Sequence, residues 1–320
     1  MTWFDAEIDS SMMAIRAIHF AATAAIAGAL VFRAVVAEPA LRCQREASAV
    51  IEPQIRKVAW TGLVVVITSG VGWVLLLTMS LSGESVGEAI MSGALSDVVT
   101  LTQFGIVAQV RLALAIALGI CLTLDRFPLA RWLALGAALC LIASIAWTGH
   151  AASTPHALGY VHLAADALHL YAASAWIGGL APLALLLRIG RRYHASAWVK
   201  LELEAVRRFS SLGMASVAVL IVSGMINAWI LVGSLRALVL TTYGWILMIK
   251  LAVFAAMLAF AAVNRFRLTP ALASPTGSEA HDRALRLVTR NTLIEIALAL
   301  VVFAIVGALG TLHPAAHLVS

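Results

Sequence analysis

Long apolar segments recur along the whole chain, and they constrain its fold more than any other feature. A helix needs about 20 apolar residues to cross a bilayer, and in lipid only helices or closed barrels satisfy every backbone hydrogen bond. The eight segments read from the sequence are 12–36, 58–81, 101–124, 131–148, 161–187, 209–232, 243–264 and 289–312. They predict an all-α, polytopic membrane protein with eight transmembrane helices.

The overall composition agrees with a membrane protein. Hydrophobic residues make up 62% of the chain and charged residues 12%, with a mean hydropathy of +0.96, which lies outside the range of soluble domains. The formal net charge of +6 does not indicate nucleic acid, because the basic residues are spread over short connections between apolar segments. The three cysteines form no CxxC pair, so no disulfide framework or thiolate metal site is predicted.

Lysine and arginine gather in alternate connections, which gives the orientation. The opposite set of connections carries only Arg236. Because basic loops stay in the cytoplasm, both termini are predicted to be periplasmic, in a bacterial inner membrane. The connection 265–287 contains Pro270 and Pro275 and is predicted to be a mobile cytoplasmic linker. His281 lies in it and is expected to be solvated.

Several sequence features occur twice, in the same order. The matched pairs are His19 with His169, Ser69-Gly70 with Ser223-Gly224, Gly105 with Gly244, and Arg111 with Lys250. An even number of helices in each copy makes the two copies enter the membrane in the same sense. The sequence therefore predicts two parallel four-helix repeats, 1–149 and 150–320.

Histidines concentrate near the predicted periplasmic side. His162, Asp166 and His169 have the spacing i, i+4 and i+7, which places them on one helical face. Ionisable groups inside a membrane segment are costly and often functional. The predicted ligand set for a metal is His19, His150, His162, Asp166, His169 and His313, with His156, His317, Met225 and Met248 as further candidates. Histidine and carboxylate without cysteine suit copper or zinc, and the thioethers favour copper. Interhelical hydrogen bonding and packing are the structural alternatives.

Three charged residues lie within the predicted spans. Arg111 and Lys250 could extend toward the outer surface along their apolar stems, they could neutralise Asp166, or they could belong to an anion pathway. Glu295 could form the lower part of an ion path with Asn291, or it could pair with arginines at the cytoplasmic interface.

The second half of the chain resembles the copper resistance protein D family (CopD) of bacterial inner-membrane proteins. The residues that carry the resemblance are Asp166-x-x-His169, Trp176-Ile177-Gly178-Gly179, Arg208-Phe209, Ser223-Gly224, Tyr243-Gly244, Lys250 and Asn264-Arg265. The resemblance implies copper handling across the cytoplasmic membrane. It also implies supply by a small periplasmic copper-binding protein of the CopC type.

Three functional hypotheses follow. The first is a copper permease, a transporter and not an enzyme, that moves copper from periplasm to cytoplasm through the predicted site. The second is a membrane redox protein that binds haem b through His19 and His169, because two histidines on neighbouring helices can ligate haem iron. The third is a metal sensor or assembly partner without transport. The predicted partners are copper, the lipid bilayer and a CopC-type protein, with no nucleic acid.

Overall fold

The computed structural model describes residues 3–42, 44–149, 156–191, 196–273, 279–312 and 314–317. Within these ranges every regular element is a helix. Eight helices are long and apolar enough to cross a membrane, so the predicted all-α polytopic fold is confirmed. These spans are Ser10–Leu41, Arg45–Ser82, Gln103–Thr123, Pro128–Thr148, Ala157–Gly190, Trp198–Val232, Thr242–Leu272 and Glu279–Leu309.

Several spans consist of two α-helices joined by a short π-helical segment. The long helices are α1 (Trp3–Phe32), α3 (Arg45–Ser82), α6 (Gln103–Thr123), α7 (Pro128–Ala143), α8 (His156–Ala173), α9 (Leu180–Gly190), α10 (Ser196–Val232), α12 (Thr242–Val263) and α14 (Glu279–Leu309). The short helices are α2 (Glu38–Leu41), α4 (Val86–Met91), α5 (Ala94–Leu101), α11 (Leu235–Leu240) and α13 (Thr269–Leu272). Three π-helical segments, η1 (Arg33–Ala37), η4 (Ser174–Gly178) and η5 (Asn264–Leu268), and two 3-10 segments, η2 (Ser144–Thr148) and η6 (Ala315–His317), complete the list.

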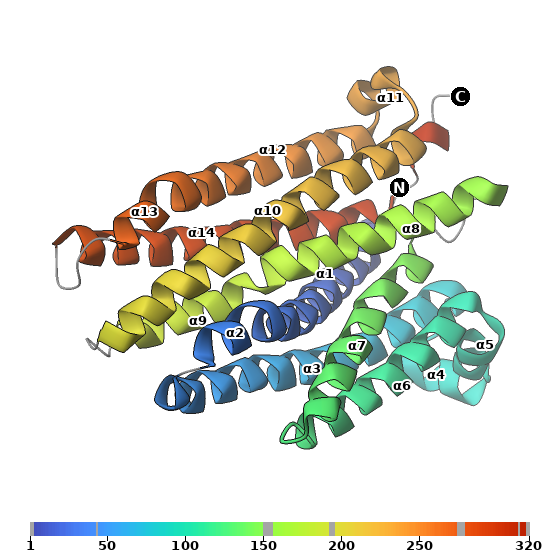
Figure 1. Cartoon of the computed structure of the whole chain (residues 1–320). Helices are drawn as coiled ribbons and strands as arrows, with labels where there is room; N and C mark the ends of the chain where they lie inside the picture. The colour runs from blue at the N-terminus through green and yellow to red at the C-terminus, as the bar shows by residue number, and fades with distance from the viewer. Residues whose placement is uncertain are drawn as a thin grey trace.

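Both chain ends lie at the same end of the bundle, as an even number of spans requires (Figure 1). The short helices α4, α5 and α11 lie at this end, and α2 and α13 lie at the opposite one. The end that carries the termini is the predicted periplasmic end, and this orientation remains a prediction.

The predicted cytoplasmic ends of several helices are longer than the apolar pattern indicates. Helix α3 begins 13 residues before the predicted start at position 58, because polar residues are tolerated once a helix leaves the hydrocarbon. The prediction of a mobile linker over 265–287 is wrong for 265–272 and 279–287, which are helical, and its middle part, 274–278, lies outside the described residues. His281 is buried, with Nδ1 3.0 Å from the carbonyl oxygen of Leu272, so the expectation of a solvated residue is also wrong.

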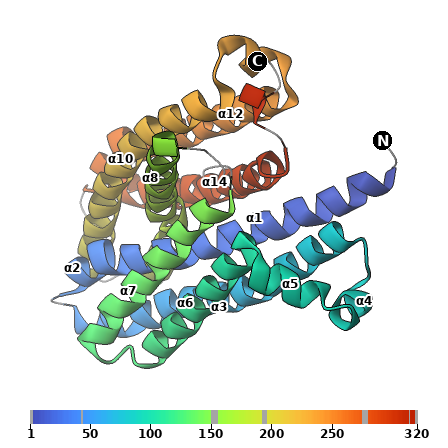
Figure 2. The same ribbon diagram turned by 90° about the vertical axis from the view of Figure 1, so that its right-hand side faces the viewer.

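Helix α1 lies at the centre of the bundle and packs against α3, α7, α14 and η4 (Figure 2). Its span and that of α8 with α9 are the most buried of the eight. The two meet at Gly28 and Gly178, nine residues beyond His19 and His169 respectively. A β-carbon at Gly178 would collide with the backbone of α1. Glycine at both positions therefore allows the two backbones to touch, as is common between membrane helices.

The starts of α6 and α12 are built in the same way. The hydroxyl of Thr102 accepts a hydrogen bond from the Gly105 amide at 2.9 Å, and that of Thr241 accepts one from the Gly244 amide at 3.0 Å. Each hydroxyl thereby satisfies a backbone donor that the helix start leaves free. This recurrence supports a repeat of α3–α6 in α10–α12, and the division at residue 150 remains a prediction.

An ionic cluster that the sequence did not predict joins the first four spans at the predicted cytoplasmic end. Arg33 Nη1 lies 2.6 Å from Asp125 Oδ1, and both side chains are buried. Glu38 lies 3.3 Å from both Arg33 and Arg131, and Arg131 also lies 3.4 Å from Glu52. These contacts connect η1, α2, α3, α7 and the turn after α6.

Candidate metal centre

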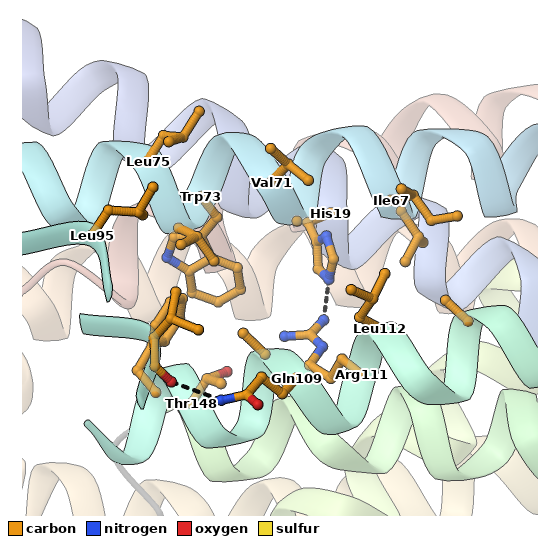
Figure 3. Close-up of a pocket in the computed structure, with 17 residues that line it drawn as sticks. His19, Ile67, Val71, Trp73, Leu75, Leu95, Gln109, Arg111, Leu112 and Thr148 are labelled. Atoms are coloured by element: carbon orange, nitrogen blue, oxygen red, sulfur yellow. Dashed lines mark hydrogen bonds between the residues drawn. The ribbon is translucent and has the colours of Figure 1, made fainter. Parts of the chain in front are cut away.

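His19 is buried where α1 meets α3 and α6 (Figure 3). Its Nδ1 lies 2.8 Å from Ser69 Oγ, and its Nε2 contacts Nη2 of Arg111. The Ser69 hydroxyl donates its single proton to the carbonyl oxygen of Val65, so His19 Nδ1 is assigned as a donor to Ser69. The Nε2 lone pair then accepts from Arg111. The atom with which His19 would bind a metal is therefore occupied by a cationic side chain.

Positive charge surrounds the His19 site. The guanidinium carbons of Arg16 and Arg111 lie 5.0 and 5.6 Å from the ring centroid of Trp73, within cation–π range. The Nε atoms of both arginines are buried without a hydrogen-bond partner. Among the residues that the structure describes, no carboxylate oxygen lies within 4.0 Å of either guanidinium. Arg111 thus contacts His19 and not Asp166, and the site offers donors and positive charge.

His169 has the same support as His19 but different neighbours. Its Nδ1 lies 3.0 Å from Ser223 Oγ, and the Ser223 hydroxyl donates to the carbonyl oxygen of Val219 at 2.6 Å. His169 Nδ1 is therefore the donor, and Nε2 carries the lone pair. A metal-binding histidine likewise donates its second ring N–H to an acceptor that fixes the tautomer, most often a carboxylate, a backbone carbonyl or water. No hydrogen bond occupies His169 Nε2 among the described contacts.

The residues beside His169 offer further acceptors. Asp166 precedes it by one turn of α8 and accepts a hydrogen bond from Asn227 Nδ2 at 3.3 Å. Asn227 Oδ1 is buried and has no hydrogen-bond partner. Lys250 of α12 interacts electrostatically with both Asp166 and His169, without an ion pair within 4.0 Å. Imidazole, carboxylate and amide oxygen together suit a cation, and Lys250 competes for the carboxylate.

The structure covers only part of the predicted ligand set. His162 lies one turn before Asp166, is 1% exposed and takes part in an interaction. His150 and His313 lie outside the described residues. In the described ranges no group of three or more His, Cys, Asp or Glu side chains is close enough to hold a metal. The six-residue metal site therefore remains a prediction.

The structure says less about the four further candidate ligands. His156 begins α8 and His317 ends η6, but their side chains lie outside the described part. Met225 follows Ser223 by two residues on α10, which turns it to another face, and it is 68% exposed. Met248 is half-buried on α12. Their role as ligands remains a prediction.

Glu295 belongs to a separate polar cluster toward the opposite end of the bundle. Its side chain is 2% exposed and accepts a hydrogen bond from Asn264 Nδ2 at 2.8 Å. Asn291 Nδ2 donates in turn to Asn264 Oδ1 at 2.9 Å. No arginine or lysine nitrogen lies within 4.0 Å of Glu295 in the described ranges, so it joins amides and not the interfacial arginines.

Three side chains of these sites were not singled out from the sequence as functional. Arg16 precedes His19 by three residues, as Asp166 precedes His169, and Trp73 follows Ser69 by four residues, as Asn227 follows Ser223. Extending the aligned repeats by one turn in each helix would have identified all three.

The fold and its paired histidine sites define a polytopic α-helical membrane protein with buried polar centres at equivalent places in two groups of helices. Family comparison identifies it further. The family domain described as "Copper resistance protein D-like, N-terminal domain" matches residues 7–160, and "Copper resistance protein D" matches residues 203–309. The chain belongs to the copper resistance protein D family, which confirms the resemblance seen in the sequence.

Three curated relatives are similar to the chain. Copper resistance protein D of Pseudomonas syringae pv. tomato is 30% identical over 85% of this chain and 87% of its own length. Copper transport protein CutJ of Bacillus subtilis is 38% identical over 40% of this chain and 23% of its length. Inner membrane protein YebZ of Escherichia coli is 31% identical over 53% of this chain and 55% of its length. No solved structure matches the chain.

Proposed function

We propose that this protein is a copper-binding permease of the bacterial inner membrane that moves copper from the periplasm to the cytoplasm. Its family membership, its eight spans and its similarity to a protein named for copper transport support this function. The observation that carries it is the set of acceptors around His169, where a fixed tautomer leaves Nε2 without a hydrogen bond beside Asp166 and Asn227.

Copper is the cargo of this site and not a resident cofactor. His169 Nε2 and the Asp166 carboxylate are the proposed first ligands, with Asn227 Oδ1 nearby. The remaining ligands would come from His162 and, outside the described residues, from His150 and His313. His19 would join only if Arg111 released its Nε2 atom.

The proposed route runs from the end of the bundle that carries the termini, which we assign to the periplasm. Two parallel repeats, 1–149 and 150–320, would enclose it. The Glu295 cluster would form its lower part, because it supplies buried oxygen atoms in the other half of the bundle. A periplasmic protein of the CopC type would deliver copper to the outer end.

The haem hypothesis requires Nε2 of both His19 and His169 to bind iron. Arg111 contacts this atom of His19, which weighs against haem as the ligand. A Soret band in protein purified from haem-supplied cells would reverse this judgement. The sensor hypothesis predicts copper binding without flux in proteoliposomes.

The test combines copper accumulation in cells with copper bound to the purified protein, measured by mass spectrometry. The double variant His162→Ala/His169→Ala is expected to lose both, because it removes two imidazoles from one face of α8. His281→Gln is the matched control, since it removes a buried imidazole at the other end of the bundle. Unchanged accumulation and binding in the double variant would refute the proposal, as would the same loss in the control.

A further inference from the structure

A pocket of about 290 Å³ opens beside the His19 site, between α3, α5 and α6 (Figure 3). Its walls are mainly aliphatic and include Val71, Leu75, Leu95, Val99 and Leu112. Val71 and Leu112 are about half exposed on spanning helices, so they face lipid. The pocket therefore communicates with the hydrocarbon of the membrane.

The short helix α5 places the pocket near one membrane surface. It packs on α3 and α6, and Leu95 and Val99 on one side of it line the pocket, while Asp97 and Thr100 are exposed. An apolar face toward the protein and a polar face toward water are typical of a helix at the membrane interface. The pocket lies beneath this helix, at the boundary between head groups and acyl chains.

The inner wall of the pocket presents hydrogen-bond donors. Arg111 is 7% exposed and lines the pocket beside His19 and Trp73. Its Nη2 donates to His19, but its Nε is buried and unpartnered, and no carboxylate lies within 4.0 Å in the described part of the chain. Arg16 adds a second guanidinium on Trp73. A buried cation without a counter-ion is unfavourable unless an anion pairs with it.

We propose that this pocket binds an anionic phospholipid, with its phosphate on Arg111 and an acyl chain along the aliphatic wall between α3 and α6. Guanidinium groups recognise phosphate oxygens by charge-assisted hydrogen bonds, and basic pockets between membrane helices bind anionic head groups. The apolar wall and the interfacial depth select a lipid over a soluble phosphate. The bound lipid supplies the counter-ion that Arg111 lacks among the described residues.

The test is native mass spectrometry of the metal-free full chain in a neutral detergent, so that its outcome does not depend on copper transport. Phosphatidylglycerol and phosphatidylcholine with identical acyl chains are the probes. The wild type is expected to retain phosphatidylglycerol at least about fivefold better, as one basic residue contributes on this scale. Arg111→Gln removes the preference and Arg111→Lys keeps part of it. Lys250→Gln is the matched control, because it removes the equivalent cation beside His169, and it leaves the preference unchanged.

Three results would overturn the proposal. The first is equal retention of the two lipids by the wild type. The second is a preference for phosphatidylglycerol that survives Arg111→Gln. The third is displacement of phosphatidylglycerol by the uncharged ubiquinone-2, since that would make the pocket a quinone site.

Discussion

The His19 and His169 sites have the same frame and opposite chemistry. In each site, a serine of the next spanning helix accepts a hydrogen bond from Nδ1 of the histidine, at 2.8 Å from His19 and 3.0 Å from His169. A glycine follows each serine, and a β-carbon there would meet the imidazole at 3.4 Å. Around His19 the unpartnered buried atoms are guanidinium donors, whereas beside His169 the unpartnered buried atom is the acceptor Asn227 Oδ1.

The difference shows how two copies of the same structural framework can take different roles. Because the histidine, serine and glycine positions fix the ring in both places, only the neighbours decide which kind of ion each site favours. Arg16 and Arg111 make the first site suited to an anion. Asp166 and Asn227 make the second suited to a cation, with Lys250 as a competitor.

The largest expected effect concerns the opposite end of the bundle, where the two halves also differ. Asp125 pairs with the buried cation Arg33, whereas Glu295 meets only amides among its described contacts. Asp125→Ala leaves the buried Arg33 with only its longer contact to the partly exposed Glu38, so the free energy of unfolding is expected to fall by about 3 kcal/mol, the lower end of the cost of breaking a buried ion pair. Reversible unfolding in mixed micelles measures it. The exposed pair of Arg208 and Glu204 is the control. Glu204→Ala is expected to lower the free energy of unfolding by less than about 1 kcal/mol. Equal losses of stability in Asp125→Ala and Glu204→Ala would contradict the stabilising role of the buried Arg33–Asp125 pair.

The contact between the two halves can be broken at Gly178. Its β-carbon would collide with the carbonyl group of Ala24, so Gly178→Leu is expected to destabilise the protein by about 1–3 kcal/mol or more. Gly136 of α7 has open space around its β-carbon and provides the matched control. Thermal unfolding of Gly178→Leu and Gly136→Leu checks the prediction. Wild-type melting of Gly178→Leu would contradict the close approach of α1 and η4.

The two serines sharpen the comparison further. Ser223→Ala removes the acceptor that orients His169, and loss of such an outer partner lowers metal affinity by about 10-fold or more. Ser69→Ala makes the equivalent change at His19 and is expected to leave copper affinity unchanged, because that imidazole faces Arg111. Competition titrations with a copper chelator measure both. A similar loss in the two variants would place copper in both sites.

The sequence predicted the membrane fold well, because lipid imposes one strong rule on every span. It predicted helix ends and the 265–287 connection poorly, since polar residues outside the hydrocarbon carry little hydropathy signal. Pro270 occupies the first turn of α13, where proline is tolerated, and so it does not end the helix.

The sites were predicted in part. The spacing of Asp166 and His169 indicated a shared helical face, and the repeat pointed to both histidines and their serines. The charge around each histidine depends on which helices pack together. The spacing of residues along one helix does not predict that packing. A longer alignment of the repeats would have pointed to Arg16 and Asn227, but their contacts and the Arg33–Asp125 pair emerged only from the structure.

The most direct test of the division of roles is a copper titration of His169→Ala and His19→Ala, purified in parallel and followed by competition with a chelator. The account predicts that His169→Ala loses copper affinity by more than the roughly 10–100-fold that removal of an outer partner costs, because a ligand itself is removed. His19→Ala is predicted to bind copper as the wild type does, since Arg111 occupies its Nε2 atom. Loss of copper affinity in His19→Ala, with wild-type affinity in His169→Ala, would contradict the account.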